Sequence, residues 1–443
     1  MNMQAVDLII EAGWIIPVVP ANTVLENHAI VIDQGVIVAL APKAEINNRF
    51  HAREQLSLNK HILTPGLINT HGHIAMSLLR GYADDLPLQR WLEDHIWPTE
   101  AKYVSEQFVK DGAGLAIAEM VRSGTTCFSD MYFFPEKTAE VARNAHIRCQ
   151  FAFPILEFPS AWAADPDSYI SKGLKLHDDY RAHPLIDVCF GPHAPYTVTD
   201  KTFNRVVPLA AELQACIQVH LHETAHEVDQ SMKEYGCRPV RRLFDLGLLT
   251  PQTQCVHMTQ IDDEDIELLI ASGAHVVHCP ESNLKLASGF CPVADLMSAG
   301  VNVAIGTDSC ASNNNLDLFG ELHTASLLAK AVAGDAAALN SHQALAMATI
   351  NGAKALNIDD KVGSLEVGKA ADIIAIAVDE LEQAPLYDAA SALVYTHNGH
   401  RVTHSWVQGK PLMADRQLLT MNQSEIMLKV DGWRDTLWNR NDG

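Results

Sequence analysis

Short runs of apolar and β-branched residues recur through the middle of the chain, and amphipathic stretches separate them. Eight of these runs are predicted to be strands: Ile62–Asn69, Thr125–Asp130, Arg148–Ile155, Ile186–His193, Cys216–His222, Gln254–Met258, His275–Cys279 and Val301–Asp308. The separating stretches repeat apolar residues every three or four positions, as helices that cover a sheet do. They include Glu106–Arg122, Lys201–Gln214, Asp262–Ala271 and Leu316–Ala331. Strand and helix therefore alternate eight times, which predicts an α/β fold of the (β/α)8, or TIM-barrel, type.

Both ends of the chain differ from its middle. Residues 5–40 hold short β-prone pieces broken by glycine and proline, and similar pieces recur at 372–377 and 402–408. Neither cluster makes a stable sheet alone, so we expect the two to pair into one small β-sandwich. The predicted division of the chain is residues 1–60 for the first part of the sandwich, 61–364 for the barrel, and 365–443 for the second part. The last of these includes a terminal helix over about 421–443.

The predicted barrel strands begin with apolar residues, and five of them end in polar segments that contain His or Asp. These segments are Thr70-His71-Gly72-His73, His193-Ala194-Pro195, His220-Leu221-His222-Glu223, His257 and Thr307-Asp308. A (β/α)8 barrel builds its site from the carboxyl ends of its strands, so it brings these segments together however far apart they are in sequence. The pattern predicts a functional site on that face, because five unrelated endings of this kind would be an unusual coincidence.

His71 and His73 give the strongest indication of a metal. Residues i and i+2 of an extended chain point the same way, so both imidazoles can reach one ion. For an isolated His-x-His the alternative is a pair of exposed loop histidines, and the matching ligands at other strand ends argue against it. His220 is a candidate third ligand. His222 shares its face parity, so spacing alone does not choose between the two.

Glu223, His257 and Asp308 complete the candidate set. A metal lowers the pKa of a bound water towards neutrality, and a carboxylate and an imidazole beside it can orient the water and accept its proton, which suits hydrolysis. Glu223 falls beyond the strand end, where it can face a substrate without binding the metal. If either His257 or Asp308 stood alone, the ordinary interpretation would be a hydrogen-bonded residue at a strand end. The fourth strand end, residues 190–194, has no Lys to bridge two metals, so we expect one.

Composition and charge limit the partners. The chain has 443 residues, with 32 Lys and Arg against 54 Asp and Glu, a formal net charge of −22. This acidity argues against a nucleic-acid partner. No apolar run reaches the roughly 18 residues that span a bilayer, and the N-terminus lacks the basic start of a secretory signal. Nine cysteines without a Cys-x-x-Cys pair indicate free thiols and a cytoplasmic protein. Barrels of this size often pair, so we expect a homo-oligomer, and the expected partner is a small molecule.

The order His-x-His, His-x-x-Glu, His and Asp on eight strand–helix units resembles the amidohydrolase superfamily. Three further segments are similar to its methylthioadenosine/S-adenosylhomocysteine deaminase group, and the likeness covers essentially the whole chain. The segments are His71 to Asp85 with Trp91-Leu92 and Ile96 to Glu100, then Gly306 to Asn314, then Gly363 to Glu366 with Gly368 to Asp372. The loop from His71 to Glu100 discriminates best among them.

The resemblance implies hydrolytic deamination of the adenine of 5′-methylthioadenosine to hypoxanthine, with release of ammonia and with S-adenosylhomocysteine and adenosine as further substrates. It implies one divalent metal per subunit, zinc, held by His71, His73, His220 and Asp308. The His-x-x-Glu spacing of the family favours His220 over His222. In that scheme metal-bound hydroxide attacks C6 of the purine, Glu223 protonates N1, and His257 and Asp308 hold and deprotonate the attacking water.

The same resemblance assigns substrate contacts. Glu100 corresponds to a carboxylate that accepts the ribose hydroxyls, and His193 to a contact at the fourth strand end; Glu223 and Asp308 also face the substrate. Apolar side chains after the first strand could wall the purine and its 5′ substituent, namely Trp97, Trp91, Leu92 and Met76. The alternative for each is ordinary core packing, and for Glu100 a solvated carboxylate at a helix start.

One departure bears on the 5′ substituent. In some members an arginine near the third strand end meets the carboxylate of S-adenosylhomocysteine, whereas here that end is residues 151–155 and has none. Arg148 stands at the strand beginning, on the opposite side of a barrel. An unpaired buried carboxylate is costly, so we expect methylthioadenosine to be turned over better than S-adenosylhomocysteine.

Two rival functions follow from the same residues. The first is another reaction on this scaffold, either deamination of guanine or cytosine or hydrolysis of a triazine, with the same ligands and a different pocket. Glu100 discriminates, because a free base or a triazine has no ribose for it to hold. The second is a non-catalytic barrel, and the presence of all six of His71, His73, His220, Glu223, His257 and Asp308 argues against it.

Overall fold

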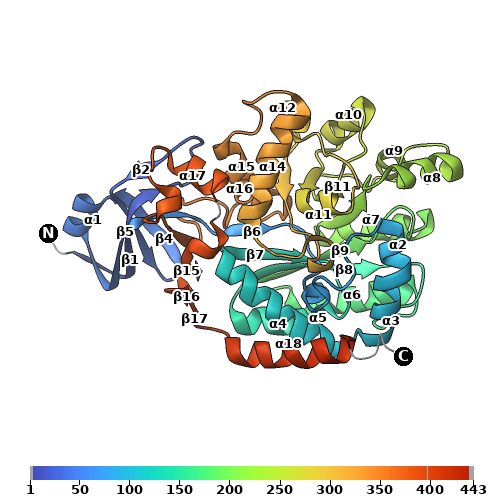
Figure 1. Ribbon diagram of the computed structural model, residues 1–443, viewed down its shortest axis with the longest axis horizontal. Coiled ribbons are helices and arrows are strands. Elements are labelled where there is room, and N and C mark those ends of the chain that lie inside the picture. The colour runs from blue at the N-terminus through green and yellow to red at the C-terminus, as the bar shows by residue number, and fades with distance from the viewer. Residues whose placement is uncertain (1–2, 397, 439–443) are drawn as a thin grey trace.

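The computed structural model describes residues 3–396 and 398–438, which form two sheets (Figure 1). One is an eight-stranded parallel sheet rolled into a barrel, and the other is a nine-stranded mixed sheet built from both ends of the chain. The predicted (β/α)8 fold, with a β structure shared by the two ends, is confirmed. Within the described ranges, no helix is both long and apolar enough to cross a membrane.

The barrel strands follow one another around the sheet in chain order, and each pairs in parallel with its neighbour. They are β6 (Leu67–Asn69), β7 (Thr125–Asp130), β8 (Arg148–Ile155), β9 (Ile186–Pro192), β10 (Ile217–Leu221), β11 (Thr253–His257), β12 (His275–His278) and β13 (Val303–Ile305). Nearly all of their residues are buried, because helices cover the outer face and side chains fill the interior. This double burial explains why the strands are continuous apolar runs in the sequence.

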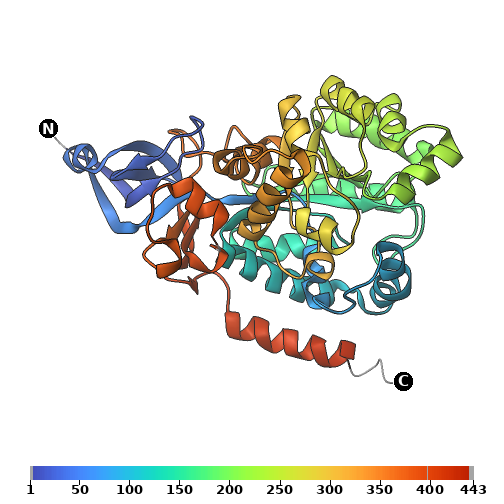
Figure 2. The same cartoon turned by 45° about the horizontal axis from the view of Figure 1, so that its top comes forward.

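Helices of several lengths connect the barrel strands (Figure 2). Those of the first half are η1 (Ile74–Leu79), α2 (Leu88–Arg90), η2 (Trp91–Ile96), α3 (Trp97–Tyr103), α4 (Glu106–Ser123), α5 (Pro135–Ala145), α6 (Pro166–Tyr180) and α7 (Asp200–Leu213). Those of the second half are α8 (Ala225–Tyr235), α9 (Pro239–Asp245), α10 (Asp263–Ser272), α11 (Pro280–Lys285), α12 (Val293–Ser298), α13 (Cys310–Asn313), α14 (Leu318–Ala333), α15 (Ser341–Met347) and α16 (Ile350–Ala355).

Strand β5 lies between the strands from the two ends of the chain and joins them into one sheet. It pairs in parallel with β1 on one side and antiparallel with β14 on the other. The mixed sheet has the order β17-β16-β15-β14-β5-β1-β3-β4, with β2 paired to β1. Its strands are β1 (Gln4–Ile15), β2 (Leu25–Glu26), β3 (His28–Asp33), β4 (Val36–Pro42), β5 (Phe50–Pro65), β14 (Ile373–Ala377), β15 (Val402–Val407), β16 (Lys410–Ala414) and β17 (Gln417–Leu418). The helices of these end regions are α1 (Lys43–Arg49), η3 (Leu381–Gln383), α17 (Ala389–Tyr395), η4 (Gly399–Arg401) and α18 (Gln423–Trp438).

The single strand predicted over Ile62–Asn69 is wrong, because the chain leaves one sheet and enters the other within it. Residues up to Pro65 belong to β5, and β6 begins at Leu67. Gly66 lies between them, packed so closely on Thr126 that an added Cβ would meet its Oγ1 at 1.9 Å. Only a residue without a side chain fits this crossing.

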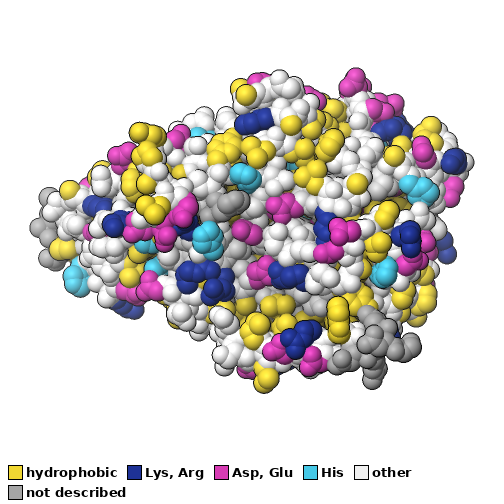
Figure 3. Space-filling model, in the orientation of Figure 1, with side chains coloured by type: hydrophobic (Ala, Val, Ile, Leu, Met, Phe, Trp, Pro, Cys, Tyr) yellow, Lys and Arg dark blue, Asp and Glu magenta, His cyan; other side chains and the backbone are white. Residues whose placement is uncertain are grey.

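Helix α18 lies along α4 on the outside of the barrel (Figures 1 and 2). The ring of Trp433 packs on Phe108 with 5.2 Å between centroids, and its Nε1 donates to the Asp111 carboxylate at 3.1 Å. Residues 439–443 of the predicted terminal helix lie outside the described residues. On the face shown in Figure 3, Lys and Arg stand among acidic side chains and form no continuous basic stripe.

The barrel closes between β6 and β13 through the segments that follow these strands. Thr70 donates its backbone N–H and its hydroxyl to the carbonyl of Ile305, at 3.1 and 2.7 Å. Asp308 N donates to His71 O at 3.1 Å. Gly306 lies against His71, where an added Cβ would meet the backbone N at 2.8 Å. The two segments that carry candidate ligands are therefore the closing seam of the barrel.

Replacing Gly306 by Ala is expected to destabilise the fold by about 1–3 kcal/mol, because the new methyl group forces His71 out of place. Gly114→Ala is the matched control, since an added Cβ there meets nothing within 4 Å and alanine suits the interior of α4. Urea unfolding of both variants measures the difference. Equal stability of the two variants would contradict the close approach at the seam.

Candidate active site

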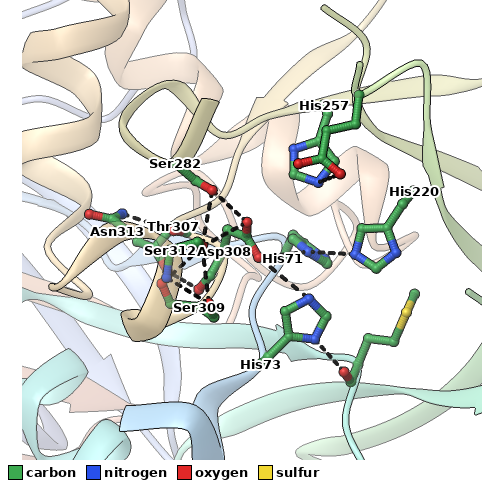
Figure 4. A network of polar contacts seen from close by, with 12 residues as sticks. His71, His73, His220, His257, Ser282, Thr307, Asp308, Ser309, Ser312 and Asn313 are labelled. Carbon is green, nitrogen blue, oxygen red and sulfur yellow. Dashed lines mark hydrogen bonds and ion pairs between the residues drawn. The ribbon is translucent and has the colours of Figure 1, made fainter. Parts of the chain in front are cut away.

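Four polar side chains converge at the carboxyl end of the barrel (Figure 4). The Nε2 atoms of His71 and His220 are 3.2 Å apart. Asp308 Oδ1 is 3.4 Å from the Nε2 of His71 and 3.4 Å from the Nε2 of His73. His71 is fully buried, His220 and Asp308 are nearly so, and His73 is partly exposed. The four side chains come from the ends of three strands, β6, β10 and β13, as the sequence predicts.

Each of the three imidazoles is held from behind through its Nδ1. His71 Nδ1 lies 2.8 Å from the side-chain oxygen of Gln218. His73 Nδ1 is 2.5 Å from the backbone carbonyl of Met131, and His220 Nδ1 is 2.7 Å from that of His193. Because a carbonyl oxygen can only accept, each Nδ1 carries the proton and each Nε2 presents a lone pair to the centre. This arrangement prepares three nitrogens to bind a cation.

Asp308 is held by two hydroxyl groups. Its Oδ2 accepts from Ser282 at 2.6 Å and from Ser312 at 3.0 Å, while Oδ1 faces the histidines. Although burial favours the neutral acid, the nearby imidazoles of His71, His73 and His257 hold the pKa of Asp308 well below its usual range. Asp308 is therefore an anion at neutral pH, and it supplies the negative charge that a metal ion requires.

Glu223 and His257 lie beside this cluster. The His257 Nε2 is 3.8 Å from Glu223 Oε2, and the amide of Asn283 contacts its Nδ1 at 3.0 Å. Burial, reinforced by the charge of Asp308, raises the pKa of Glu223 well above its usual value. Glu227 accepts the backbone N–H of Glu223 at 2.9 Å and so fixes the start of this loop. A buried carboxylic acid that keeps its proton is suited to donating it.

His222 lies outside the cluster. Its Nδ1 contacts the carbonyl of Gln260 at 3.0 Å, and its Nε2 accepts the backbone N–H of Val240 at 3.1 Å. Both ring nitrogens are thus engaged with backbone groups, and neither is directed at the cluster. The structure brings His220 to the centre, and His222 ties this strand end to α9.

Several strand ends are bent into the left-handed region. His222, His257 and Asp308 have φ values of 52°, 79° and 58°. Residues with a side chain rarely adopt this conformation, and such residues cluster at functional sites. The turn also breaks the simple alternation of faces along a strand, which explains how His220 and Glu223 can face one space while His222 does not.

A cavity opens above the cluster and encloses about 910 Å³ of empty space, including its mouth. This is within the roughly 300–1,000 Å³ typical of small-molecule sites. All the predicted site residues except His71 line it, and so do Met76, Trp91, Leu92 and Trp97. Aromatic side chains that the sequence analysis did not single out complete the wall, namely Tyr132, Phe133, Phe158 and Tyr196. The cavity is polar at its floor and apolar at its sides.

Glu100 and His193 both line this cavity. The Tyr132 hydroxyl donates to Glu100 Oε1 at 2.6 Å. Burial raises the pKa of Glu100 to about 7, against the opposing effect of that hydrogen bond. His193 Nδ1 is 2.9 Å from the Thr197 hydroxyl, and burial lowers the pKa of His193 to about 3, so it is neutral. Arg148 lies far from the wall, paired with Asp372 at 3.0 Å.

The donor set fits a divalent metal. Histidine and carboxylate atoms that lie within 4.8 Å of one another form two overlapping groups, His71 with His73 and Asp308, and His71 with His220 and His257. Burial, with the nearby His71, lowers the pKa of His73 to about 4, so the ring does not compete for the proton at neutral pH. Nitrogen and carboxylate ligands of this kind suit zinc and other first-row metals.

Several residues that support the site were missed in the sequence. Ser282 and Asn283 follow β12, in a polar strand ending like the five that were recognised. Ser312 and Glu227 gave no signal of their own, since polar residues near helix starts are common. Gln218 stands two positions before His220 on the same face of its strand, and that parity could have indicated it.

Comparison with known proteins identifies the family of this chain. The model of the amidohydrolase family matches residues 62–412. The chain belongs to the amidohydrolase family. It is 54% identical over 436 residues to the 5-methylthioadenosine/S-adenosylhomocysteine deaminase of Teredinibacter turnerae, with 98% of this chain and 99% of that protein covered. The resemblance inferred from the sequence motifs is confirmed.

Two solved structures extend the comparison. An adenosine deaminase from Xanthomonas campestris with bound zinc superposes with a TM-score of 0.98, at 47% identity, over 99% of this chain and 100% of that one. The atrazine chlorohydrolase of Arthrobacter aurescens, complexed with zinc, gives a TM-score of 0.90 at 23% identity, over 96% and 99% of the two chains. At 23% identity, the second likeness shows only that this amidohydrolase and the chlorohydrolase share a fold.

The geometry predicts different effects for two neighbouring histidines. His220→Asn is expected to abolish retention of zinc after dialysis, because its Nε2 faces the cluster. His222→Asn is the matched control and should retain the metal, although it loses contacts to Gln260 and Val240 and melts at a lower temperature. Metal analysis of both dialysed variants, with circular dichroism to record folding, measures this. Zinc retained by His220→Asn and lost by His222→Asn would contradict the assignment.

Proposed function

We propose that this amidohydrolase is a hydrolytic deaminase that converts the adenine of 5′-methylthioadenosine to hypoxanthine and releases ammonia. One observation carries the proposal. The His71, His73, His220 and Asp308 cluster lies at the floor of a cavity whose wall presents Glu223 beside the cluster and Glu100 farther out. The name of the relative that shares 54% identity supports the same substrate.

We assign the metal ligands to His71, His73, His220 and Asp308, with one divalent ion, zinc, per subunit. When bound, such an ion lowers the pKa of a coordinated water and so supplies a hydroxide nucleophile near neutral pH. The zinc in the Xanthomonas campestris structure supports this choice of metal. The Gln218, Met131 and His193 oxygens behind the histidines keep the three rings directed at the ion.

Proton transfer is assigned to Glu223, His257 and Asp308. Burial and the Asp308 charge raise the pKa of Glu223 well above its usual value and so favour the carboxylic acid, which can protonate N1 of the purine. This makes C6 electrophilic. His257, whose ring is held by Asn283, orients the attacking water together with Asp308, and the two take up its proton. The proton taken up from the water then passes to the C6 amino group, which leaves as ammonia when the tetrahedral carbon collapses, while the proton of the new C6 hydroxyl restores the Glu223 carboxylic acid.

Substrate binding is assigned to the cavity wall. Glu100 accepts the ribose hydroxyls, supported on its other side by Tyr132. His193 contacts the nucleoside near the fourth strand end, and Trp97, which is 39% exposed at the mouth, covers it from the solvent side. Glu223 and Asp308 contact the purine at the reacting carbon and its neighbouring nitrogen.

The 5′ side of the cavity favours a small apolar substituent. Pro154 in the third strand, and Leu156 and Phe158 just after it, lie there, and no Lys or Arg is among the described residues that line the cavity. An adjoining hollow that shares Trp97 and Tyr196 has none among its described residues either, and it carries Glu93. The carboxylate of S-adenosylhomocysteine would therefore lose water without gaining a cation. Methylthioadenosine should be the better substrate.

We also propose that the enzyme is a cytoplasmic homo-oligomer. All nine cysteines are free thiols, and eight of them are buried. Their unpaired state supports a reducing compartment.

An ultraviolet assay of the zinc-loaded protein tests the reaction. Methylthioadenosine is expected to lose its adenine absorbance fastest, with S-adenosylhomocysteine slower and free adenine and guanine unchanged. Glu223→Gln keeps the shape of the side chain but removes its acidic proton, so kcat should fall about 100-fold or more. No absorbance change with any adenosine compound would contradict the function. A kcat/KM for S-adenosylhomocysteine equal to or above that for methylthioadenosine would contradict the 5′ preference.

The role of Glu100 predicts a pH effect on ribose recognition. Its pKa of about 7 means that the accepting carboxylate predominates above pH 7 and is lost as the pH falls below it. The kcat/KM of adenosine relative to 2′,3′-dideoxyadenosine should therefore decrease from pH 8.5 to pH 6. Hydrogen bonds to a charged group contribute about 1.5–3 kcal/mol, so the ratio should fall roughly 10- to 100-fold in Glu100→Gln. A ratio unchanged by both pH and mutation would rule out this contact.

A further inference from the structure

Three buried glutamine side chains cross the interior of the barrel below the histidine cluster. They are Gln218 on β10, Gln254 on β11 and Gln150 on β8, and none is more than 2% exposed. Gln218 and Gln254 are direct partners in the pairing of their strands. The reaction described above uses none of them except as the contact behind His71. Three amides in an apolar barrel core require full hydrogen bonding, so their arrangement is informative.

The three amides form one continuous chain of hydrogen bonds. Gln150 Nε2 donates to the carbonyl of Leu356 at 3.1 Å and to Asp187 at 3.0 Å. Gln254 Nε2 donates to the carbonyl of Ala355 at 2.9 Å and to Gln150 Oε1 at 2.9 Å.

The chain continues from Gln254 to the cluster. Gln218 Nε2 donates to Gln254 Oε1 at 2.5 Å and to the carbonyl of Thr70 at 3.0 Å. The Oε1 of Gln218 then faces His71 Nδ1 at 2.8 Å. A path of polar contacts thus runs from Asp187, at the exposed beginning of β9, to a residue of the metal cluster.

The direction of the chain is fixed by backbone carbonyls. A carbonyl only accepts, so Leu356, Ala355 and Thr70 each oblige one glutamine to turn its NH2 group towards them. Ala355 and Leu356 end helix α16, where carbonyls lack partners within the helix and need a donor. Once the NH2 groups are committed, Gln218 has only its oxygen to offer His71. His71 must then carry its proton on Nδ1.

We propose that Gln218, Gln254 and Gln150 form an orienting relay that sets the tautomer of His71. The α16 carbonyls fix the orientation of the Gln150 and Gln254 amides, and Gln254 in turn fixes that of Gln218. As a result, the Nε2 lone pair of His71 faces the metal position. Gln218 and Gln254 are positioning residues, because they act through His71 and touch no substrate. The inference rests on the metal site of the proposed function and not on the reaction, so it can be tested if the deaminase activity is absent.

Zinc affinity measures the relay directly. The variants are Gln218→Met and Gln254→Met, since methionine has a similar unbranched shape without the amide. Gln383→Met is the matched control, because Gln383 is also buried and hydrogen-bonded, to Asn398, but has no link to the cluster. Apo protein is titrated with zinc against a chromophoric chelator, and thermal unfolding records whether each variant folds.

The expected order of zinc dissociation constants separates the relay from general damage. Gln218→Met should weaken zinc binding about 10- to 100-fold, the usual effect of losing a partner behind a metal ligand. Gln254→Met should weaken zinc binding less than Gln218→Met does, but more than Gln383→Met does. An unchanged constant in Gln218→Met overturns the proposal. If the zinc dissociation constant of Gln254→Met is no higher than that of Gln383→Met, the relay does not extend beyond Gln218, and that part of the proposal is overturned. Should Gln218→Met not fold, Gln254→Met carries the test.

The tautomer itself is a second readout that simple loss of packing would not change. Nitrogen-15 NMR of histidine-labelled apo protein distinguishes a ring protonated on Nδ1 from one protonated on Nε2. His71 should be protonated on Nδ1 in the wild-type protein and in Gln383→Met, and it should shift towards Nε2 in Gln218→Met. A wild-type His71 protonated on Nε2 overturns the proposal whatever the affinities are.

Discussion

The closing seam of the barrel is the constraint on which the rest of the structure depends. Strands β6 and β13 are short, and the hydrogen bonds that join them come from Thr70, His71 and Asp308, just beyond their ends. Gly306 allows this approach because it has no side chain. Closure of the fold and assembly of the cluster are therefore one event. A chain that has not closed its barrel cannot hold the Asp308 carboxylate beside His71 and His73.

A second constraint is that the histidines stay neutral beside a single carboxylate, and burial imposes this constraint. The imidazoles lie too close together, and too far from water, to become charged together, as the low pKa values of His73, His193 and His257 reflect. Burial acts in the opposite direction on Glu223, which keeps its proton. The same dry environment thus prepares bases that bind a cation and an acid that donates a proton. Solvent at the cluster would weaken both effects.

The sequence predicts the elements well because they follow from simple periodicity, and the barrel brings the candidate ligands at the strand ends together. Strands β7 and β8 match their predicted bounds, since both faces are buried and the runs are unbroken. Spacing left His220 and His222 equivalent, because the alternation of faces ends where the backbone turns left-handed. Partners such as Ser282 and Gln254 stayed hidden for another reason. Which buried polar groups meet is determined by strand register and barrel closure, and neither can be read from one strand.

The fold does not select the substrate, and the structure indicates what does. A triazine-degrading enzyme shares this backbone at 23% identity. In the proposed function, the residues that distinguish a nucleoside lie mostly outside the strands, in the segment from η1 to α3 that carries Trp91, Trp97 and Glu100. That segment lines the cavity and contributes no strand to the barrel sheet, so it can change while the cluster and the seam stay fixed. On this proposal, catalytic chemistry resides in the seam of the barrel, and specificity resides in the loop beside it.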